Sequence, residues 1–469
     1  MISSFLNFLP ACRWLAISLL LLAGCSSLPK IVPDLARHPG LPVQMEGARG
    51  ALSVAQTKAI LGRLESHSVE TGIFERHLAV EESIVGSPLT TGNDVRLLQD
   101  GPATYQAMFA AIDAAVDHIN LETYILDDDE IGQRFAQALI AKQQQGVQVN
   151  LMHDSVGTID TPTDFFQQLT DSGIQVLEFN PINPLETRKE WTLNQRDHRK
   201  LLIVDGSTAF LGGINISSVY SGGSFSKRLR LKPDRGPDGR LAWRDTDLQL
   251  QGPVVAEFQK LFISAWENQK GAPLAEKNYF PPPKIAGDQV VRAIGSSSEE
   301  PFSLIYATLL SAIGSAETSV HITNAYFVPD PQLLAALEAA ARRGVGVTLI
   351  LPSRTDSWLV FHAGRGYYAR LLRAGVKIFE RRGVILHSKT ALIDGVWATV
   401  GSTNLDWRSF LHNHELNAVV LGSAFGKQVQ AMFAKDLAMS DEITLEQWRK
   451  RGLNPRLKEW FARVWEYWL

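Results

Sequence analysis

Cysteine is scarce in this chain: there are two among 469 residues, and both lie near the N-terminus, at Cys12 and Cys25. Most of the sequence therefore has no thiol for a disulfide bond, a zinc thiolate site or a cysteine nucleophile. The histidines do not replace the missing thiols, because His118, His321 and His362 lack the spacing of ligands in a zinc site. We therefore expect no metal ion and no other cofactor.

The chain also lacks an excess of charge of either sign. It has 46 Lys and Arg residues against 49 Asp and Glu residues, a net charge of −3. A protein that coats nucleic acid usually presents a strongly basic face. We therefore expect no nucleic-acid partner, although a local basic pocket stays open, and no protein partner is evident. With 45% hydrophobic residues, the chain is long enough for two domains or one large duplicated domain.

Long apolar runs are missing as well. Beyond the N-terminus, no stretch reaches the roughly 18 apolar residues that a membrane-spanning helix needs. At the N-terminus, Arg13 precedes a shorter, mostly apolar run at residues 14–22. This arrangement is typical of an export signal, which we place at residues 1–24.

The end of this signal, Leu-Ala-Gly-Cys at residues 22–25, resembles the lipobox of bacterial lipoproteins. We therefore expect Cys25 to carry acyl chains and residues 25–50 to form a tether. An ordinary signal peptide or a short membrane anchor is the alternative. Ser26 and Ser27 after the cysteine favour the outer over the inner membrane of a Gram-negative bacterium, with the protein facing the periplasm.

What the sequence does contain is one short pattern, His-x-Lys-x-x-x-x-Asp, that occurs twice, as His198, Lys200 and Asp205 and again as His387, Lys389 and Asp394. A Gly-rich turn follows each copy at the same offset and ends at Asn215 or Asn404. The apolar run inside each copy predicts a buried strand, on which the histidine and the lysine point to the same side. Two copies of one half-site indicate one shared active site.

The duplication extends beyond this pattern. Residues 118–124 parallel residues 321–326, and residues 146–151 parallel residues 344–349. Each half alternates short β-branched runs with amphipathic helices. The sequence therefore predicts an α/β fold of two tandem lobes, each a mixed β-sheet flanked by helices, related by a pseudo-two-fold axis with one active site between them.

The expected boundaries follow from these repeats. The segments are an N-terminal helical segment at 51–94, a first lobe at 95–270, a linker at 271–300, a second lobe at 301–440 and an aromatic C-terminal extension at 441–469.

Two imidazoles and two ammonium groups match the needs of phosphodiester chemistry. Cleavage requires a nucleophile in line with the leaving oxygen, a proton for that oxygen and cations for the non-bridging oxygens. One histidine can attack phosphorus to form a covalent phosphohistidine while the other donates a proton to the departing alkoxide. The second histidine then acts as the base for the incoming alcohol or water.

On these features the chain resembles the phospholipase D superfamily. It is similar to bacterial cardiolipin synthases in the segments HRKLLIVDGSTAFLGGINIS, ITNAYFVPD and LHSKTALIDGVWATVGSTNLD. The similarity covers roughly residues 95–439. It implies that His198 is the nucleophile and His387 the acid and base, with the reverse assignment still open. The groups implied to bind the phosphoryl oxygens are Lys200, Lys389, Asn215 and Asn404.

The superfamily also places an acidic residue one strand beyond each motif, and Asp245 and Glu415 occupy the matching places. Each carboxylate would orient one imidazole and stabilise its protonated form. Asp247 is a weaker alternative to Asp245, and an ordinary solvated strand end is the alternative for both acids. Asp205 and Asp394 belong to the catalytic motifs, but we expect them to hold the turn through local hydrogen bonds.

The resemblance implies a transferase that moves a phosphatidyl group to phosphatidylglycerol and so makes cardiolipin, with phosphatidylethanolamine as an alternative donor. Hydrolysis uses the same intermediate, so a phospholipase D-type phosphodiesterase or a nuclease stays an alternative. A third alternative is a non-catalytic lipid-binding lipoprotein, against which the two intact motifs argue.

Two segments are compatible with a membrane surface as a partner. Residues 221–240 are Gly-rich and basic, and they either lie on anionic headgroups or form a solvated loop. The C-terminal extension either presents an aromatic helical face to a bilayer or packs against the preceding domain. Its aromatic residues are Trp448, Trp460, Phe461, Trp465, Tyr467 and Trp468. A substrate contact through His412 or His414 also stays open.

Overall fold

The computed structural model describes residues 30–33, 40–66, 72–182, 194–222 and 241–469. The predictions for the signal peptide at 1–24 and for the lipidation of Cys25 lie outside these residues, as does most of the basic segment 221–240. None of the helices in the described ranges combines the length and the hydrophobicity that crossing a bilayer requires.

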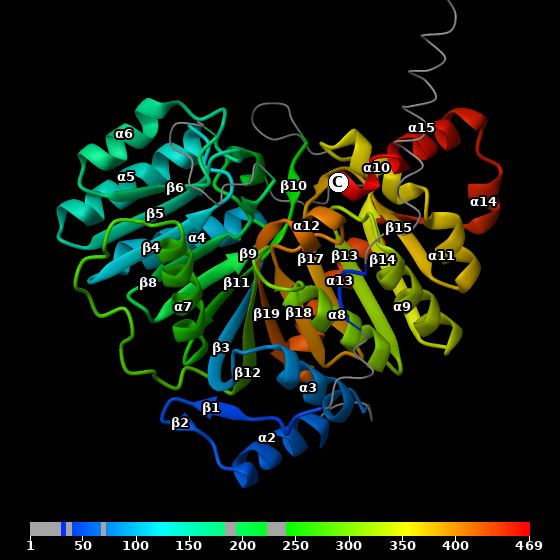
Figure 1. Cartoon of the computed structure of the whole chain (residues 1–469), viewed down its shortest axis with the longest axis horizontal. Helices are drawn as coiled ribbons and strands as arrows, with labels where there is room; N and C mark the ends of the chain where they lie inside the picture. The colour runs from blue at the N-terminus through cyan, green and yellow to red at the C-terminus, as the bar shows by residue number, and fades with distance from the viewer. Residues whose placement is uncertain (1–29, 34–39, 67–71, 183–193, 223–240) are drawn as a thin grey trace, which may run out of the picture.

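One mixed β-sheet runs through both halves of the molecule (Figure 1). We call the elements from β3 to α7 the first lobe. Its strands are β3 (Leu89–Gln99), β4 (His118–Thr123), β5 (Gln148–Asp154), β6 (Gln175–Phe179), β7 (Arg196–Asp197), β8 (Leu201–Val204), β9 (Thr208–Gly212), β10 (Trp243–Arg244) and β11 (Thr246–Gln251). Its helices are α4 (Asp100–Ala114), α5 (Glu130–Gln144), α6 (Thr163–Asp171), η2 (Ser218–Tyr220) and α7 (Val254–Asn268).

The second lobe, from β12 to α13, repeats this order. Its strands are β12 (Gln289–Ser296), β13 (Ser319–Asn324), β14 (Gly346–Pro352), β15 (Lys377–Arg381), β16 (Ile385–Leu386), β17 (Lys389–Ile393), β18 (Trp397–Gly401) and β19 (Asn413–Leu421). Its helices are α8 (Leu304–Ser315), α9 (Pro331–Arg342), α10 (Trp358–Arg365), α11 (Tyr368–Ala374), α12 (Trp407–Leu411) and α13 (Ser423–Ala438).

Strand pairing shows how the lobes are joined. The first lobe has the order β6-β5-β4-β8-β9-β11-β3, and the second has the matching order β15-β14-β13-β17-β18-β19-β12. β3 pairs with β12, so the two sheets are continuous. The predicted α/β fold with mixed sheets flanked by helices is confirmed.

Further elements lie at the two ends. Before the first lobe come β1 (Met45–Gly47), β2 (Gly50–Ala51), α2 (Val54–Ser66) and α3 (Ile73–Ile84), and after the second come β20 (Ser440–Ile443), α14 (Leu445–Arg449), α15 (Leu453–Arg463) and η4 (Glu466–Trp468). β20 extends the sheet beside β15.

Two strands differ from the expected boundaries. β3 begins within the segment 51–94, for which the sequence predicts helix, and it pairs with β1, β11 and β12. The strand is hard to recognise in the sequence because Gly92 and Asn93, which are typical of turns, lie inside it. β12 lies within the expected linker 271–300, although it is the strand that connects the lobes.

The central core belongs to both lobes. α7 has its apolar residues at helical spacing and contributes Phe258 and Phe262, and α13 contributes Val429 and Met432 to the same buried cluster. Strands β9, β11, β18 and β19 supply the facing side chains. This shared core fixes the two motif strands, β8 and β17, relative to each other.

Candidate active site

The backbone brings each motif histidine to the acid of the opposite lobe. β7, which precedes His198, pairs in parallel with the start of β19, and the N–H of His198 donates to the carbonyl of His414 at 2.9 Å. β16, which precedes His387, pairs in parallel with β10, and the N–H of His387 donates to the carbonyl of Arg244 at 2.8 Å. In both cases the residue that follows the accepting residue is the predicted acid, Glu415 after His414 and Asp245 after Arg244.

Both imidazoles contact these acids through Nδ1. Nδ1 of His198 lies 3.1 Å from each carboxylate oxygen of Glu415, and Nδ1 of His387 lies 2.7 Å from Oδ2 of Asp245. All four side chains are buried. A proton held on Nδ1 by a carboxylate leaves the lone pair on Nε2, where a nucleophile or a base needs it.

The two acids are themselves held in place. Glu415 accepts hydrogen bonds from the hydroxyl of Ser402 and from Asn413, and Asp245 accepts one from the N–H of Thr246 at 2.8 Å. These contacts limit how far each carboxylate can rotate. Burial raises the pKa of Glu415, but the hydrogen bond from His198, the charge of Lys200 and the hydrogen bond from Ser402 reverse this, so that the pKa is lowered overall.

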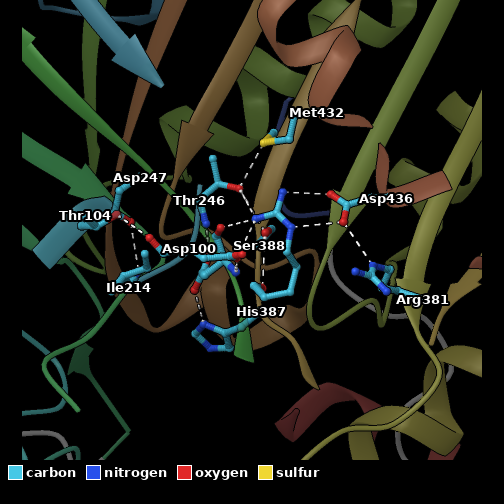
Figure 2. Close-up of polar contacts among 12 residues, drawn as sticks. Asp100, Thr104, Ile214, Thr246, Asp247, Arg381, His387, Ser388, Met432 and Asp436 are labelled. Atoms are coloured by element: carbon cyan, nitrogen blue, oxygen red, sulfur yellow. Dashed lines mark hydrogen bonds and ion pairs between the residues drawn. The ribbon is translucent and has the colours of Figure 1, made fainter. Parts of the chain in front are cut away.

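An ionic network lies behind His387. Asp436 on α13 accepts hydrogen bonds from Arg244 at 3.1 and 2.9 Å and from Arg381 at 3.1 Å, close to Ser388 and His387 (Figure 2). The three side chains are at most 1% exposed. Because the Arg244 carbonyl accepts the N–H of His387, this network braces the backbone of the second motif.

One cavity of about 230 Å³ is lined by both histidines. Asn215 and Asn404 line it as well. Asn215 donates to the hydroxyl of Tyr220 at 3.0 Å, whereas Oδ1 of Asn404 has no hydrogen-bond partner among the described residues. The structure thus brings the histidines and asparagines of both predicted half-sites to one space between the lobes.

The two lysines are not among the residues that line the cavity, and each contacts the histidine of its own motif. Nζ of Lys200 donates to the carbonyl of His198 at 2.5 Å, and Nζ of Lys389 donates to the carbonyl of His387. Burial lowers the pKa of Lys200 to about 7, with the Lys389 charge adding to this effect, and lowers the pKa of Lys389 to about 8. Each ammonium has three N–H donors, so donors remain after the carbonyl is satisfied.

Burial also lowers the pKa of both histidines. It lowers the pKa of His198 to about 4, with Lys200 adding to the shift and Glu415 opposing it. It lowers the pKa of His387 as well, with Lys389 adding and Asp245 opposing. Burial therefore favours the uncharged form of both imidazoles.

The motif aspartates lie away from this cavity, at the far ends of β8 and β17. Both have a positive φ, of 51° at Asp205 and 50° at Asp394. Each carboxylate accepts backbone N–H groups from a distant segment: Val116, Asp117 and His118 for the first, and Glu317, Thr318 and Ser319 for the second. The expectation that they hold their own turn therefore needs correction, because they hold the starts of β4 and β13.

Comparison with known proteins identifies the family of this chain. A family model described as "Cardiolipin synthase, PLD-like domain" matches residues 108–221 and 309–437. The chain belongs to this phospholipase D-like family. It is 34% identical to a cardiolipin synthase of Geobacillus sp. (strain WCH70) over 391 residues, which cover 82% of this chain and 74% of that protein. It is 36% identical to cardiolipin synthase A of Pseudomonas entomophila (strain L48) over 368 residues, covering 77% and 72%.

A solved structure supports the fold assignment of this phospholipase D-like chain. The crystal structure of phosphatidylserine synthase from Haemophilus influenzae Rd KW20 matches it with a TM-score of 0.59, covering 83% of this chain and 99% of that chain. The sequence identity is 13%, so this likeness concerns the fold alone.

Sequence reasoning missed several residues that line the cavity of this family member. They are Tyr124, Ile125, Arg196, Trp243, Tyr326, Asp356, Asp406, Arg408 and Asn413. Tyr220 was missed too, and its hydroxyl lies 3.3 Å from Nδ1 of His387. Of these residues, only Tyr124 and Tyr326 could have been singled out from the sequence, because they occupy matching places in the two repeats.

Other candidates do not line this cavity. His414 is buried against Phe179 and His412 lies outside the lining, so neither contacts the space between the motifs. Asp247 accepts the N–H of Ile214 and has no contact with a motif histidine, and burial raises its pKa well above the ordinary value. Within the described part of the chain, no cluster of three metal-ligating side chains is found.

The aromatic residues of the C-terminal extension divide into two groups. Trp448 is buried against Tyr368, and Tyr467 packs near Trp407. In contrast, the apolar residues of α15 and the chain end that are at least 48% exposed are Leu453, Leu457, Trp460, Phe461, Val464, Trp465 and Trp468. Part of this extension thus packs against the preceding domain, and another part leaves an apolar face exposed.

Proposed function

We propose that this protein is a phosphatidyltransferase that makes cardiolipin from phosphatidylglycerol through a covalent phosphohistidine. The observation that carries the proposal is that His198 and His387, from different lobes, line one cavity with Nδ1 of each held by a buried carboxylate. The relatives named cardiolipin synthase supply the substrate class.

In the first step, Nε2 of neutral His198 attacks the phosphorus of the donor lipid. A P–N bond forms, the P–O bond to the headgroup glycerol breaks, and His387 donates the proton that the leaving oxygen needs. The neutral state of His198, with its pKa near 4, suits the attacking role. The ammonium groups of Lys200 and Lys389 offset the charge on the non-bridging oxygens.

Substrate binding prepares His387 for the acid role. Burial lowers the pKa of this histidine in the empty site, but a phosphate anion beside it favours the protonated form, as Asp245 already does. In the second step neutral His387 accepts the proton of an incoming lipid hydroxyl. A new P–O bond then forms as the P–N bond breaks, which releases cardiolipin and restores His198.

The test is a product assay with purified protein and phosphatidylglycerol vesicles, with and without phosphatidylethanolamine. Mass spectrometry should detect cardiolipin and glycerol, and both His198→Ala and His387→Ala should abolish them. Phosphatidic acid as the only lipid product would replace the transferase with a hydrolase. Lipid products that persist in both variants would remove the histidines from the chemistry.

We also propose that the protein works at a membrane surface, with α15 as a contact. Its exposed apolar residues recur at intervals of three and four, so they share one helical face, and the exposure of this apolar face to water is unfavourable. α15 lies beside α10, and the N–H of Arg408, a cavity residue, donates to the carbonyl of Leu469 at 3.1 Å (Figure 1). The apolar face is thus tied to the cavity through the C-terminus.

Vesicle sedimentation tests this contact. Leu457→Ser combined with Trp460→Ser should lower binding to phosphatidylglycerol vesicles at least about tenfold, because two large apolar side chains leave the bilayer boundary. Ile285→Ser, which changes another exposed apolar residue outside α15, is the control. Equal binding by all three proteins would contradict a role for α15.

A further inference from the structure

The cavity contains two guanidinium groups that the histidine and lysine chemistry does not use. Arg196 comes from β7 of the first lobe and Arg408 from α12 of the second. Both lie near the phenol of Tyr124. Burial raises the pKa of this phenol to about 12, and the charges of both arginines oppose the shift. Tyr124 contacts the ring of His198 at 5.1 Å between centroids, so the arginines lie on the His198 side of the cavity.

Other contacts fix both arginines but do not neutralise them fully. Arg196 is 1% exposed, donates to the hydroxyl of Ser155 at 2.8 Å and lies 3.7 Å from Asp154, and its Nε has no hydrogen-bond partner among the described residues. Arg408 donates to the side chain and carbonyl of Asn194 at 2.9 and 3.4 Å. In the described part of the chain it forms no ion pair.

Charge in the cavity is therefore distributed unevenly. Burial lowers the pKa of Arg196, and repulsion from Arg408, which lines the same cavity, adds to this. Among the acidic lining residues, Asp356 accepts a hydrogen bond from the hydroxyl of Tyr326, whose oxygen lies 2.7 Å from each carboxylate oxygen, and it favours the protonated form of His387. The His198 side thus carries both guanidinium groups, of which Arg196 has Asp154 as an ion-pair partner, and the His387 side carries the carboxylate of Asp356.

A cationic region beside the reaction centre matches the chemistry of a phosphate-bearing acceptor. In phosphatidylglycerol the attacking hydroxyl belongs to a glycerol whose other end is esterified to a phosphate. The acceptor therefore brings a second anion into the cavity while the first phosphate is bonded to histidine. Two anions in one buried space need cations beyond the two lysines.

We propose that Arg196 and Arg408 form a subsite for the phosphate of the acceptor lipid. This inference rests on the proposed transferase function. When the hydroxyl attacks, its proton passes to His387, the P–N bond to His198 breaks and a P–O bond forms. The arginines hold the acceptor phosphate throughout and take no part in bond making. They favour a phosphate-bearing alcohol over glycerol or water, and so favour transfer.

Competition between acceptors on the wild-type protein tests the subsite first. Phosphatidylglycerol vesicles are supplied with labelled glycerol or with labelled glycerophosphoglycerol, which adds a phosphate without acyl chains. The subsite predicts that glycerophosphoglycerol captures the intermediate at least about tenfold more efficiently, as expected for charge-assisted hydrogen bonds. Equal capture of the two alcohols would overturn the proposal.

Arg408→Gln tests the residue itself, and the readout is the ratio of cardiolipin formation to labelled glycerol exchange. This ratio should fall about 10- to 100-fold, with partial recovery in Arg408→Lys, which keeps the charge. Arg373→Gln, at an exposed position on α11, should leave the ratio unchanged.

Failure of the subsite and failure of the transferase give different results. If the arginines bind the donor phosphate instead, Arg408→Gln lowers both reactions equally, and the unchanged ratio overturns the proposal. If the wild-type protein exchanges glycerol but forms no cardiolipin, the proposed transferase function fails. A misfolded Arg408→Gln protein loses both reactions, and the wild-type acceptor competition then decides.

Discussion

At the scale of residues, each imidazole depends on a carboxylate from the other lobe. Asp245 contacts Nδ1 of His387 at 2.7 Å, and both oxygens of Glu415 contact Nδ1 of His198. The acids fix which ring nitrogen carries the proton and stabilise the imidazolium. Removing the carboxylate charge while keeping the side-chain shape isolates this role.

We expect Asp245→Asn to lower kcat for cardiolipin formation by about 10³- to 10⁴-fold, because the amide favours the wrong tautomer of His387. Steady-state kinetics on vesicles measure the effect. Asp247→Asn is the matched control, since Asp247 lies two residues further along and touches neither histidine. A small loss in Asp245→Asn, similar to that in the control, would speak against the orienting role.

The lowered pKa values of the two lysines lead to a prediction of how activity depends on pH. As pH rises through about 7, Lys200 loses its proton and with it the charge that binds phosphate, so kcat/KM should fall. Lys200→Arg keeps the charge at all these pH values. The alkaline limb of kcat/KM should therefore move to about 8, where Lys389 titrates. An alkaline limb at the same pH in both proteins would contradict this assignment.

The sequence could predict the histidines and the lysines because they recur at fixed offsets in the two repeats. The two acids do not, since Asp245 follows His198 by 47 residues and Glu415 follows His387 by 28, so their prediction rests on the resemblance to the superfamily. It could not predict Arg196, Arg408 or Asp356, since these have no matching partner in the other repeat and come from segments far apart in the chain. Only the folded chain brings them together. The roles of the motif residues stay predictions that the experiments above address.

At the scale of elements, the short parallel pairs β7–β19 and β10–β16 set the register between lobes. They are two residues long, so sequence patterns give no sign of them. The β10 pair is reinforced from α13, where Asp436 binds Arg244 and Arg381. The sequence likewise predicts a linker where β12 lies, because this strand contains no part of the repeated motif.

We expect Asp436→Asn to lower the free energy of unfolding by about 3–5 kcal/mol, because it leaves two buried guanidinium groups without their shared carboxylate. Asp441→Asn removes an exposed partner of Arg382 and should cost less than about 1 kcal/mol. Urea unfolding followed by circular dichroism compares the two. Similar losses would mean that the Asp436 network contributes little to stability.

At the scale of the whole molecule, the continuous sheet and shared core make one active site out of two repeats. β3 pairs with β12, and α7 and α13 contribute to one buried cluster. Neither lobe alone supplies both an imidazole and the carboxylate that orients it. One chain should therefore bind and process one donor lipid at a time.

Trapping the covalent intermediate tests this account most directly. Protein mixed with short-chain phosphatidylglycerol is quenched in alkali, which preserves phosphohistidine, and analysed by intact mass and peptide mass spectrometry. The account predicts one phosphatidyl group per chain, on His198, and none in His198→Ala. Two groups on one chain, a group on another residue, or unchanged labelling in His198→Ala would contradict a single site shared by the two histidines.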